Sequence, residues 1–226
     1  MKKLFLPFLF VSFLPTFFSC SSSNLNGYRL NERDAASAIR QMLELGARES
    51  VTGAFSKEAI MTTLFPESVK KTLQTIQQLG LTNEVDRFTT TLNTAAEKAA
   101  TNSIPIFTGA ISKMSISDAM RIIKTDGTPA SDYLRSSVGA DVRKSIVPVM
   151  RDALNEYKLI EQWEKIIKPA QAFTKDRVNL DIANLMAGMV SEAMFRKIEE
   201  KEKEIRARAE ARTTPLLKKV FSRKWD

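Results

Sequence analysis

The chain of 226 residues contains no histidine, and its only cysteine is Cys20. Without histidine it cannot form the Ser-His-Asp or Cys-His arrangements that activate a catalytic nucleophile, and it offers no imidazole ligand to zinc. One cysteine cannot form an internal disulfide bond. Any catalysis would have to use carboxylates, lysine, tyrosine or serine with lysine. The sequence therefore favours a non-enzymatic protein, and we expect no cofactor and no metal site.

Long hydrophobic runs are scarce, and the most apolar stretch is residues 4–18, near the start of the chain. This stretch is shorter than the about 20 apolar residues that cross a bilayer, and Pro7 and Pro15 interrupt it. Basic residues precede it, and Ser19 and Cys20 follow it. A charged start, an apolar segment and a small residue at the cut form the usual order of a secretory signal peptide.

Cys20, directly after the small Ser19, is similar to the lipobox cysteine of bacterial lipoproteins, whose thiol is acylated and becomes the new N-terminus. Acylation by more than one chain would anchor the protein stably, because each buried methylene contributes about 0.8 kcal/mol. We therefore expect a lipoprotein signal peptide at 1–19 and a lipid anchor on Cys20. A plain secretory signal with cleavage near Ser23 is the alternative.

The rest of the chain is expected to form a polar tether at 20–31 and a single helical domain at 32–226. This organisation predicts a protein of the bacterial cell envelope that is lipid-anchored and faces the periplasm. The chain is basic, with a net charge of +8 at pH 7. Nucleic acid is not an expected partner, because an exported protein rarely meets it and the chain lacks an aromatic-rich basic motif. Anionic lipid suits a tethered basic protein, and an envelope protein is the other expected partner.

Helical patterns fill the chain from Asn31 onward, and no segment alternates in the manner of a strand. The predicted fold is all-α, a single irregular multi-helix bundle. One long C-terminal helix, the longest of the chain, is expected over about 181–211. A short final helix is expected after it, because Thr214-Pro215 combines a capping residue with a first-turn proline.

Prolines are expected to mark other helix boundaries. Pro105 and Pro129 have the position of first-turn residues, and Thr128 precedes Pro129 as a capping residue. Pro148 interrupts an apolar pattern and predicts a kink or a fresh helix start. A short helix is expected over 159–167, followed by a loop.

Several sequence runs occur in an order that is typical of one protein family. They are 92–99 (LNTAAEKA), 105–107 (PIF), 118–119 (DA), 127–135 (GTPASDYLR), the residues Glu202, Ile205 and Arg206, and then 211–214 (ARTT) and 216–221 (LLKKVF). Together they resemble the domain-of-unknown-function 4197 family, a set of all-helical exported bacterial proteins. The resemblance implies a helical fold and an exported protein. It implies no activity, because the family has no established one.

A polar network or pocket is the first candidate site. Asn93 and Glu97 lie one helical turn apart on one face, and Arg135 and Arg206 are candidate partners for Glu97 or Asp118. A buried ion-pair network that fixes the register of the helices is one interpretation, and a pocket for an anionic or amide-bearing ligand is another. The candidate residues are Asn93, Glu97, Asp118, Arg135, Arg206 and Arg212.

A methionine stripe is the second candidate site. Met186, Met189 and Met194 recur along one face of the long helix, and thioether-rich surfaces can form adaptable apolar grooves for an acyl chain or a peptide. The other interpretation is an ordinary helix core.

The basic C-terminal stretch 218–225 also has two interpretations. It could touch a membrane surface through its cations and aromatic residues, or it could pack its apolar side onto the body and point its lysines outward.

Three functions remain open from these patterns. The first is a non-enzymatic helical binding or scaffold domain of the envelope. The second is a carrier or sensor of a hydrophobic or anionic small molecule. The third is a carboxylate-based hydrolase, which requires a cleft lined by Glu97, Asp118 and an arginine.

Overall fold

The structure is a computed structural model that describes residues 30–52, 55–65, 67–78, 80, 82–156, 158, 161 and 181–225. Within these residues every regular element is helical, which confirms the predicted all-α class. The elements are α1 (Glu32–Glu49), α2 (Lys57–Ala59), a π-helical turn (Ile60–Leu64), α3 (Glu67–Gln78), α4 (Thr82–Lys113), α5 (Ile116–Lys124), α6 (Pro129–Glu156), α8 (Ile182–Ala207), a 3-10 turn (Ala209–Ala211) and α9 (Pro215–Phe221).

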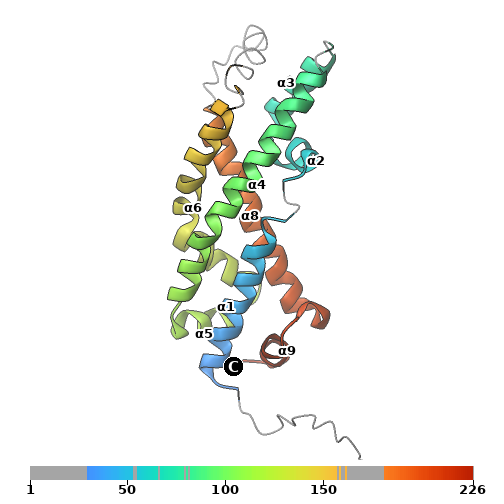
Figure 1. The fold of residues 1–226 in the computed structure, drawn as a ribbon. Helices are drawn as coiled ribbons and strands as arrows, with labels where there is room; N and C mark the ends of the chain where they lie inside the picture. Colours follow the sequence, from blue (N-terminus) through green and yellow to red (C-terminus); the bar gives the residue numbers. More distant parts are fainter. Residues whose placement is uncertain are drawn as a thin grey trace, which may run out of the picture.

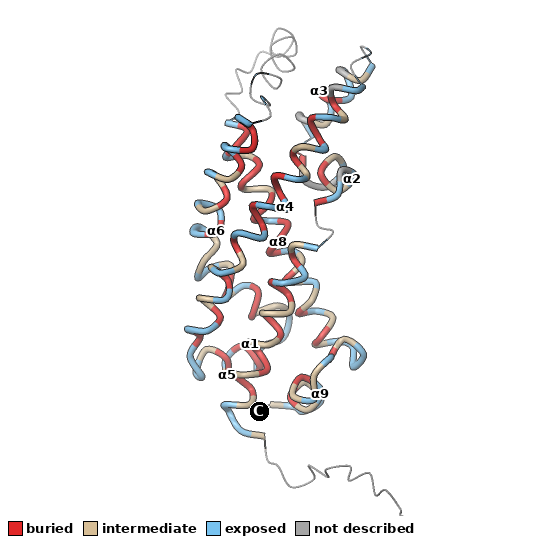
Figure 2. Tube along the Cα trace, viewed as in Figure 1, coloured by how far each residue is buried: buried red, intermediate tan, exposed pale blue. Residues whose placement is uncertain are grey.

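Four long helices form the body of the molecule. Helix α4 packs along α6, α6 packs along α8, and α8 packs along α1 (Figure 1). Each of these helices carries buried residues along its length (Figure 2), and these residues belong to one core. The short helices α5 and α9 lie at the same end as the start of α1, whereas α3 lies at the opposite end (Figure 1). We call the end with α5 and α9 the α9 end.

Helix α1 begins where the sequence predicts. The side chain of Asn31 accepts hydrogen bonds from the backbone N–H groups of Arg33 and Asp34, and the Asp34 carboxylate accepts one from the Asn31 N–H. This reciprocal capping box satisfies amide groups that have no partner inside the helix. The apolar face of α1 is buried, and Gly46 on the same helix allows close contact with Ile198 of α8.

Helix α4 does not begin at Pro105, so that prediction is wrong. The helix runs unbroken from Thr82 to Lys113 and carries Pro105 inside it. Proline removes one backbone hydrogen bond, but Leu92, Phe107 and Ile111 on both sides of it are buried in one core. Because this packing secures the helix before and after the proline, the local signal for a helix start is overridden. Helix α6 likewise continues through Pro148 instead of starting afresh there.

The long C-terminal helix is confirmed, with two corrections. Helix α8 ends at Ala207 instead of Ala211, because the backbone at Arg208 is extended and a 3-10 turn follows. It is also shorter than α4, with 26 residues against 32. Asp181 caps its first turn, and Thr214 caps α9 before Pro215 as predicted.

Other predictions lie outside the described residues. These are the signal peptide at 1–19, the lipid anchor on Cys20, most of the tether at 20–31 and nearly all of the expected helix at 159–167. Among the helices that the structure does describe, none is long and apolar enough to cross a membrane.

Candidate functional site

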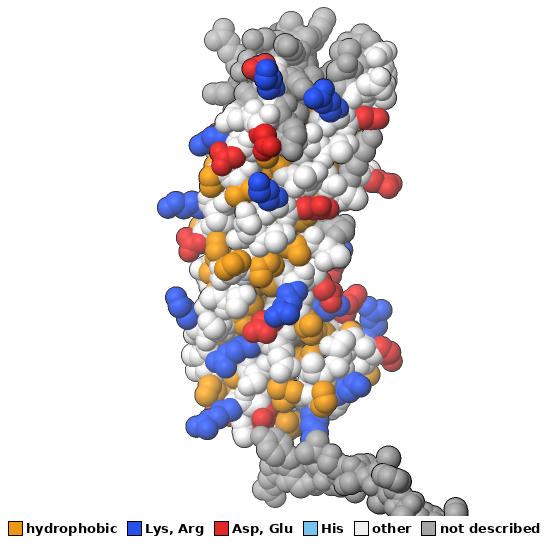
Figure 3. All heavy atoms as spheres, viewed as in Figure 1, with side chains coloured by type: hydrophobic (Ala, Val, Ile, Leu, Met, Phe, Trp, Pro, Cys, Tyr) orange, Lys and Arg blue, Asp and Glu red, His pale blue; other side chains and the backbone are white. Residues whose placement is uncertain are grey.

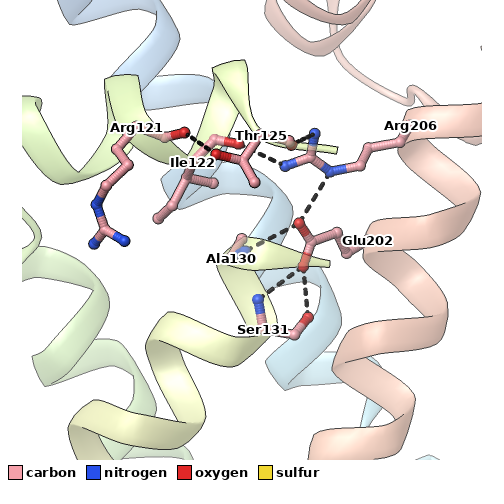
Figure 4. Close-up of polar contacts among 7 residues, drawn as sticks. All are labelled: Arg121, Ile122, Thr125, Ala130, Ser131, Glu202 and Arg206. Carbon is pink, nitrogen blue, oxygen red and sulfur yellow. Dashed lines mark hydrogen bonds and ion pairs between the residues drawn. The ribbon is translucent and has the colours of Figure 1, made fainter. Parts of the chain in front are cut away.

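The most completely bonded polar group in the described core is the carboxylate of Glu202, on the second-last turn of α8. Glu202 is fully buried. Its Oε1 accepts hydrogen bonds from the backbone N–H of Ala130 at 3.1 Å and from Nε of Arg206 at 3.0 Å. Its Oε2 accepts two from Ser131, the backbone N–H and the hydroxyl, each at 2.7 Å (Figure 4). A carboxylate has about four acceptor positions, so all of those on Glu202 are used.

Glu202 therefore supplies the cap of a different helix. Ala130 and Ser131 belong to the first turn of α6, which begins at Pro129 as predicted. The backbone N–H groups of a first turn have no intrahelical partner, and a negative charge there also interacts favourably with the helix dipole. The turn before α6 contains Gly127 at φ +86°, a backbone conformation that glycine adopts without strain. This turn brings the α6 N-terminus against α8.

Arg206 extends the same network to α5. While its Nε donates to Glu202, its Nη2 donates to the carbonyl of Ile122 at 3.0 Å and its Nη1 to that of Thr125 at 3.2 Å (Figure 4). These carbonyls lie at the C-terminal end of α5, where backbone acceptors also lack helical partners. Arg206 and Glu202 thus join the end of α5, the start of α6 and the last turns of α8.

Arg212 closes the end of α8. Its Nε donates to the carbonyl of Ile205 at 2.9 Å and its Nη2 to that of Arg206 at 2.9 Å, while Nη1 contacts the Ser222 hydroxyl at 3.3 Å. Only 9% of Arg212 is exposed. The guanidinium group replaces the amides that a continuing helix would have offered, which explains why α8 can stop at Ala207 and turn toward α9.

Arg135 has a different partner from the ones expected. It pairs with Glu192 of α8, and its guanidinium carbon lies 4.8 Å from the centre of the Phe195 ring. Both charged side chains are partly open to solvent, at 38% and 47% of their surface. This pair bridges α6 and α8 on the outside of the bundle and does not belong to the Glu202 network.

The remaining predicted polar residues are separated from one another. Glu97 is exposed on α4, and Asp118 bonds locally on α5 with Ser115 and Arg121. The hydrogen bond from the Ser115 hydroxyl, followed by that from Arg121, lowers the pKa of Asp118. The Oδ1 atom of Asn93 is buried and has no hydrogen-bond partner among the described residues. Of the six predicted residues, the structure brings Arg206 and Arg212 together.

The methionine stripe lies inside the bundle. Met186 and Met194 are 0% exposed, and Met189 packs against the same core from a partly buried position. These side chains fill space between helices, as the core interpretation expects, and they do not line the cleft described next.

An open cleft of about 450 Å³ lies at the α9 end, next to the buried network. Arg206 belongs to both, since its guanidinium carbon lies 5.8 Å from the centre of the Phe221 ring, which also lines the cleft. A volume of this order is typical of small-ligand sites. The lining residues are Ile123, Asp126, Gly127, Lys203, Arg206, Ala207, Val220, Phe221, Arg223 and Trp225.

The cleft is predominantly basic. Its lining contains Lys203, Arg206 and Arg223 and one carboxylate, that of Asp126. Lys203 also pairs with Glu199, and Arg206 with Glu202. A hydrogen bond to Glu199 raises the pKa of Lys203, so its ammonium stays charged at neutral pH. Lysine and arginine side chains are also present on the visible surface of the α9 end (Figure 3). This arrangement suits an anionic ligand.

Helix α9 forms one wall of the cleft and packs against the body of the molecule. Leu217 and Val220 are buried, while Lys218 is exposed. The apolar side of α9 therefore packs onto the bundle and leaves its basic side outward, which agrees with the second interpretation of the C-terminal stretch. The chain then turns back, and the Trp225 Nε1–H donates to the Val220 carbonyl at 3.0 Å.

The sequence interpretation did not select Glu202 as a site residue, although a signal was present. Glu202 is four residues after Ile198 and three before Ile205, and both isoleucines are buried. A lone glutamate at this spacing lies on the apolar face of the helix. Such a carboxylate must find several donors, because a buried charge without partners is very costly.

Comparisons with known proteins give a match to one protein family. A search of curated proteins and a search of solved structures find no match to the chain. The model of one protein family, described as "Protein of unknown function (DUF4197)", matches residues 29–222, which include α1 to α9. The chain therefore belongs to the DUF4197 family.

Proposed function

We propose that this protein is an envelope lipoprotein whose helical domain is a non-enzymatic binding module for an anionic envelope component. One observation carries the proposal. The cleft at the α9 end combines three basic and two aromatic side chains, Lys203, Arg206, Arg223, Phe221 and Trp225. It lies beside Leu30, from which the chain leads back toward Cys20, because Arg223 Nη1 donates to the Leu30 carbonyl at 3.3 Å.

Binding is a better use of these residues than proton transfer. A general base needs a free acceptor for the proton that it removes, and every acceptor position of Glu202 is already used. The hydrolase hypothesis required Glu97, Asp118 and an arginine around one cleft, but neither carboxylate lines the cleft at the α9 end. The carboxylate that does line it is Asp126.

The second candidate function is a carrier or sensor of an anionic small molecule. The cleft volume of about 450 Å³ favours it, because a molecule of drug-like size would fit. A soluble ligand of this kind would fill the cleft alone, whereas an envelope surface would also contact the exposed basic side of α9.

Fractionation of the producing cells tests the proposal. The native protein is expected in the membrane pellet after a high-salt wash, with a mature chain that begins at an acylated Cys20. The control variant Cys20→Ser should lose the acyl mass and leave the pellet. An unmodified thiol in the native protein, or a mature chain that begins beyond residue 20, would contradict the lipoprotein proposal.

A further inference from the structure

We infer that the α9 end docks onto the phosphate groups of anionic phospholipids in the membrane that holds the tether. This inference rests on the proposed function and names its ligand. The cleft cations would contact lipid phosphates, and the basic side of α9 would face the same surface. The domain would then lie with its α9 end on the membrane instead of moving freely on its tether.

The position of the tether supports this orientation. Leu30 is the first described residue, and its carbonyl accepts a hydrogen bond from Arg223 in the cleft. At about 3.5 Å per extended residue, the chain from Cys20 to Leu30 spans at most about 35 Å. An acylated Cys20 would therefore keep the α9 end near the bilayer. The opposite end, with α3 and the start of α4, has no such constraint, because α4 alone is about 48 Å long.

The distribution of charge also supports it. Residues 215–225 contain Lys218, Lys219, Arg223 and Lys224 and no acidic residue. Basic residues this close to an anionic leaflet are attracted by its surface potential, and the attraction adds up over the residues that reach it. One soluble phosphate could contact only a few cations of the cleft. A lipid surface presents many phosphates together, so it can also use the cations outside the cleft.

The aromatic side chains suit the polar boundary of a bilayer. The guanidinium carbon of Arg223 lies 4.8 Å from the centre of the Trp225 ring. This stacking orients a planar group that has five N–H donors, and such donors match phosphate oxygens. Tryptophan combines a large apolar ring with a polar N–H, which is why it is enriched at membrane–water interfaces. Trp225 is therefore both a contact residue and a natural probe.

Fluorescence quenching of Trp225 tests the inference on the full-length, lipid-anchored protein. The variant Trp163→Phe leaves Trp225 as the sole tryptophan, since the chain has two. The protein is reconstituted into phosphatidylcholine vesicles with or without phosphatidylglycerol, both with a nitroxide quencher on lipid headgroups. We expect stronger quenching with phosphatidylglycerol, and the difference should fall as salt screens the charges.

Charge variants locate the contact. Arg223→Gln and Lys203→Gln should each lower the ratio of docked to undocked protein about fivefold, the factor that corresponds to about 1 kcal/mol per basic residue at an anionic surface. The control Arg87→Gln removes the same charge from an exposed position near the start of α4, at the opposite end, and should leave quenching unchanged. Circular dichroism of each variant shows whether it is folded.

Three results would overturn the inference. The first is equal quenching in both kinds of vesicle. The second is an equal loss of quenching for Arg87→Gln and Arg223→Gln. The third is a change in Trp225 emission with soluble glycerol phosphate that matches the change with anionic vesicles, because the ligand would then be a free anion. Each of these results leaves the acylation of Cys20, and with it the lipoprotein proposal, intact.

Discussion

Ser131 donates two hydrogen bonds to one oxygen of Glu202, from its backbone N–H and from its hydroxyl, each at 2.7 Å. The two residues are 71 positions apart in the chain. Their contact fixes the start of α6 against α8, and Arg206 adds the end of α5 through the same carboxylate. The charged groups of this region therefore hold helix ends together.

Replacing Glu202 by alanine should destabilise the protein by about 3–5 kcal/mol. The substitution leaves Arg206 and two first-turn amides without their acceptor in a buried place, and the loss of one partner of a buried ion pair typically costs this much. Urea unfolding of both proteins measures the difference. Glu192→Ala is the matched control, since Glu192 is partly exposed in its pair with Arg135, and should cost at most about 1 kcal/mol. Similar losses for the two variants would contradict the structural role of Glu202.

Replacing Arg135 by alanine should cost less, about 1–2 kcal/mol. If Arg135 paired with a buried carboxylate, its loss would cost several kcal/mol. Its actual partner is the partly exposed Glu192, a pair worth about 0–1 kcal/mol, and its contact with Phe195 adds about 0.5–1 kcal/mol. Thermal or urea unfolding distinguishes the two cases. A loss above about 3 kcal/mol would show that Arg135 has a buried partner after all.

Replacing Gly46 by alanine should destabilise the contact between α1 and α8 by about 1–3 kcal/mol, the usual cost of overpacking a core. The new Cβ would lie 3.1 Å from the Cα of Ile198, a backbone atom that cannot move without moving α8. The control is Gly109→Ala in α4, where a Cβ would meet no atom within 4 Å. Alanine at that position should stabilise the helix by up to about 1 kcal/mol. Effects of equal sign at the two positions would contradict this packing.

Asp181 should make the stability of α8 depend on pH in acid. The backbone N–H of Asn184, with further hydrogen bonds from the Asn184 side chain and the Ala183 N–H, lowers the pKa of Asp181 below its ordinary value of 3.8. The folded state favours the charged form of this carboxylate more than the unfolded state does. The contribution of Asp181 to the stability of the folded protein is therefore complete above about pH 3.8, and it is lost as the pH falls through the lowered pKa.

The variant Asp181→Ala should therefore be less stable than the native protein by about 0.5–2 kcal/mol at neutral pH, the usual worth of a helix cap. The difference should shrink below pH 3.8. Asp181→Asn keeps a capping oxygen without the titration, so it should retain most of the stability at neutral pH. Urea unfolding at several pH values measures all three proteins. If the difference in free energy of unfolding between the native protein and the alanine variant stays constant down to pH 2, the result would contradict the capping role of Asp181.

The helix starts could be predicted from the sequence because their causes are local. Asn31 with Asp34, Ser115 with Asp118, and Thr214 before Leu217 each place donor and acceptor within three residues. Pro105 shows the limit of such rules. The proline signal is local as well, but the helix is held by packing against α6 and α8, which lie much later in the chain.

The candidate site was harder to predict than the helix starts, because its contacts with α5 and α6 join residues that lie far apart in the chain. The sequence indicated that Arg206 and Arg212 take part in polar contacts, but their acceptors include backbone carbonyls of Ile122, Ile205 and Arg206 itself. Any residue has such a carbonyl, so no residue type marks the acceptor. The Arg135 partner was missed because α8 has five glutamates and nothing in the sequence distinguishes Glu192 from the others as a partner. The cleft depends on the path of the chain after Phe221, which only the three-dimensional fold defines.

Hydrogen–deuterium exchange of the native lipid-anchored protein in vesicles tests most directly whether the α9 end lies on the membrane. Amides of residues 215–225 and 123–127 should exchange more slowly with phosphatidylglycerol present than in phosphatidylcholine alone. Amides near the start of α4 should be unaffected, because that end lies away from α9 (Figure 1). Equal exchange at the α9 end in both membranes, or protection confined to the start of α4, would contradict the proposed orientation.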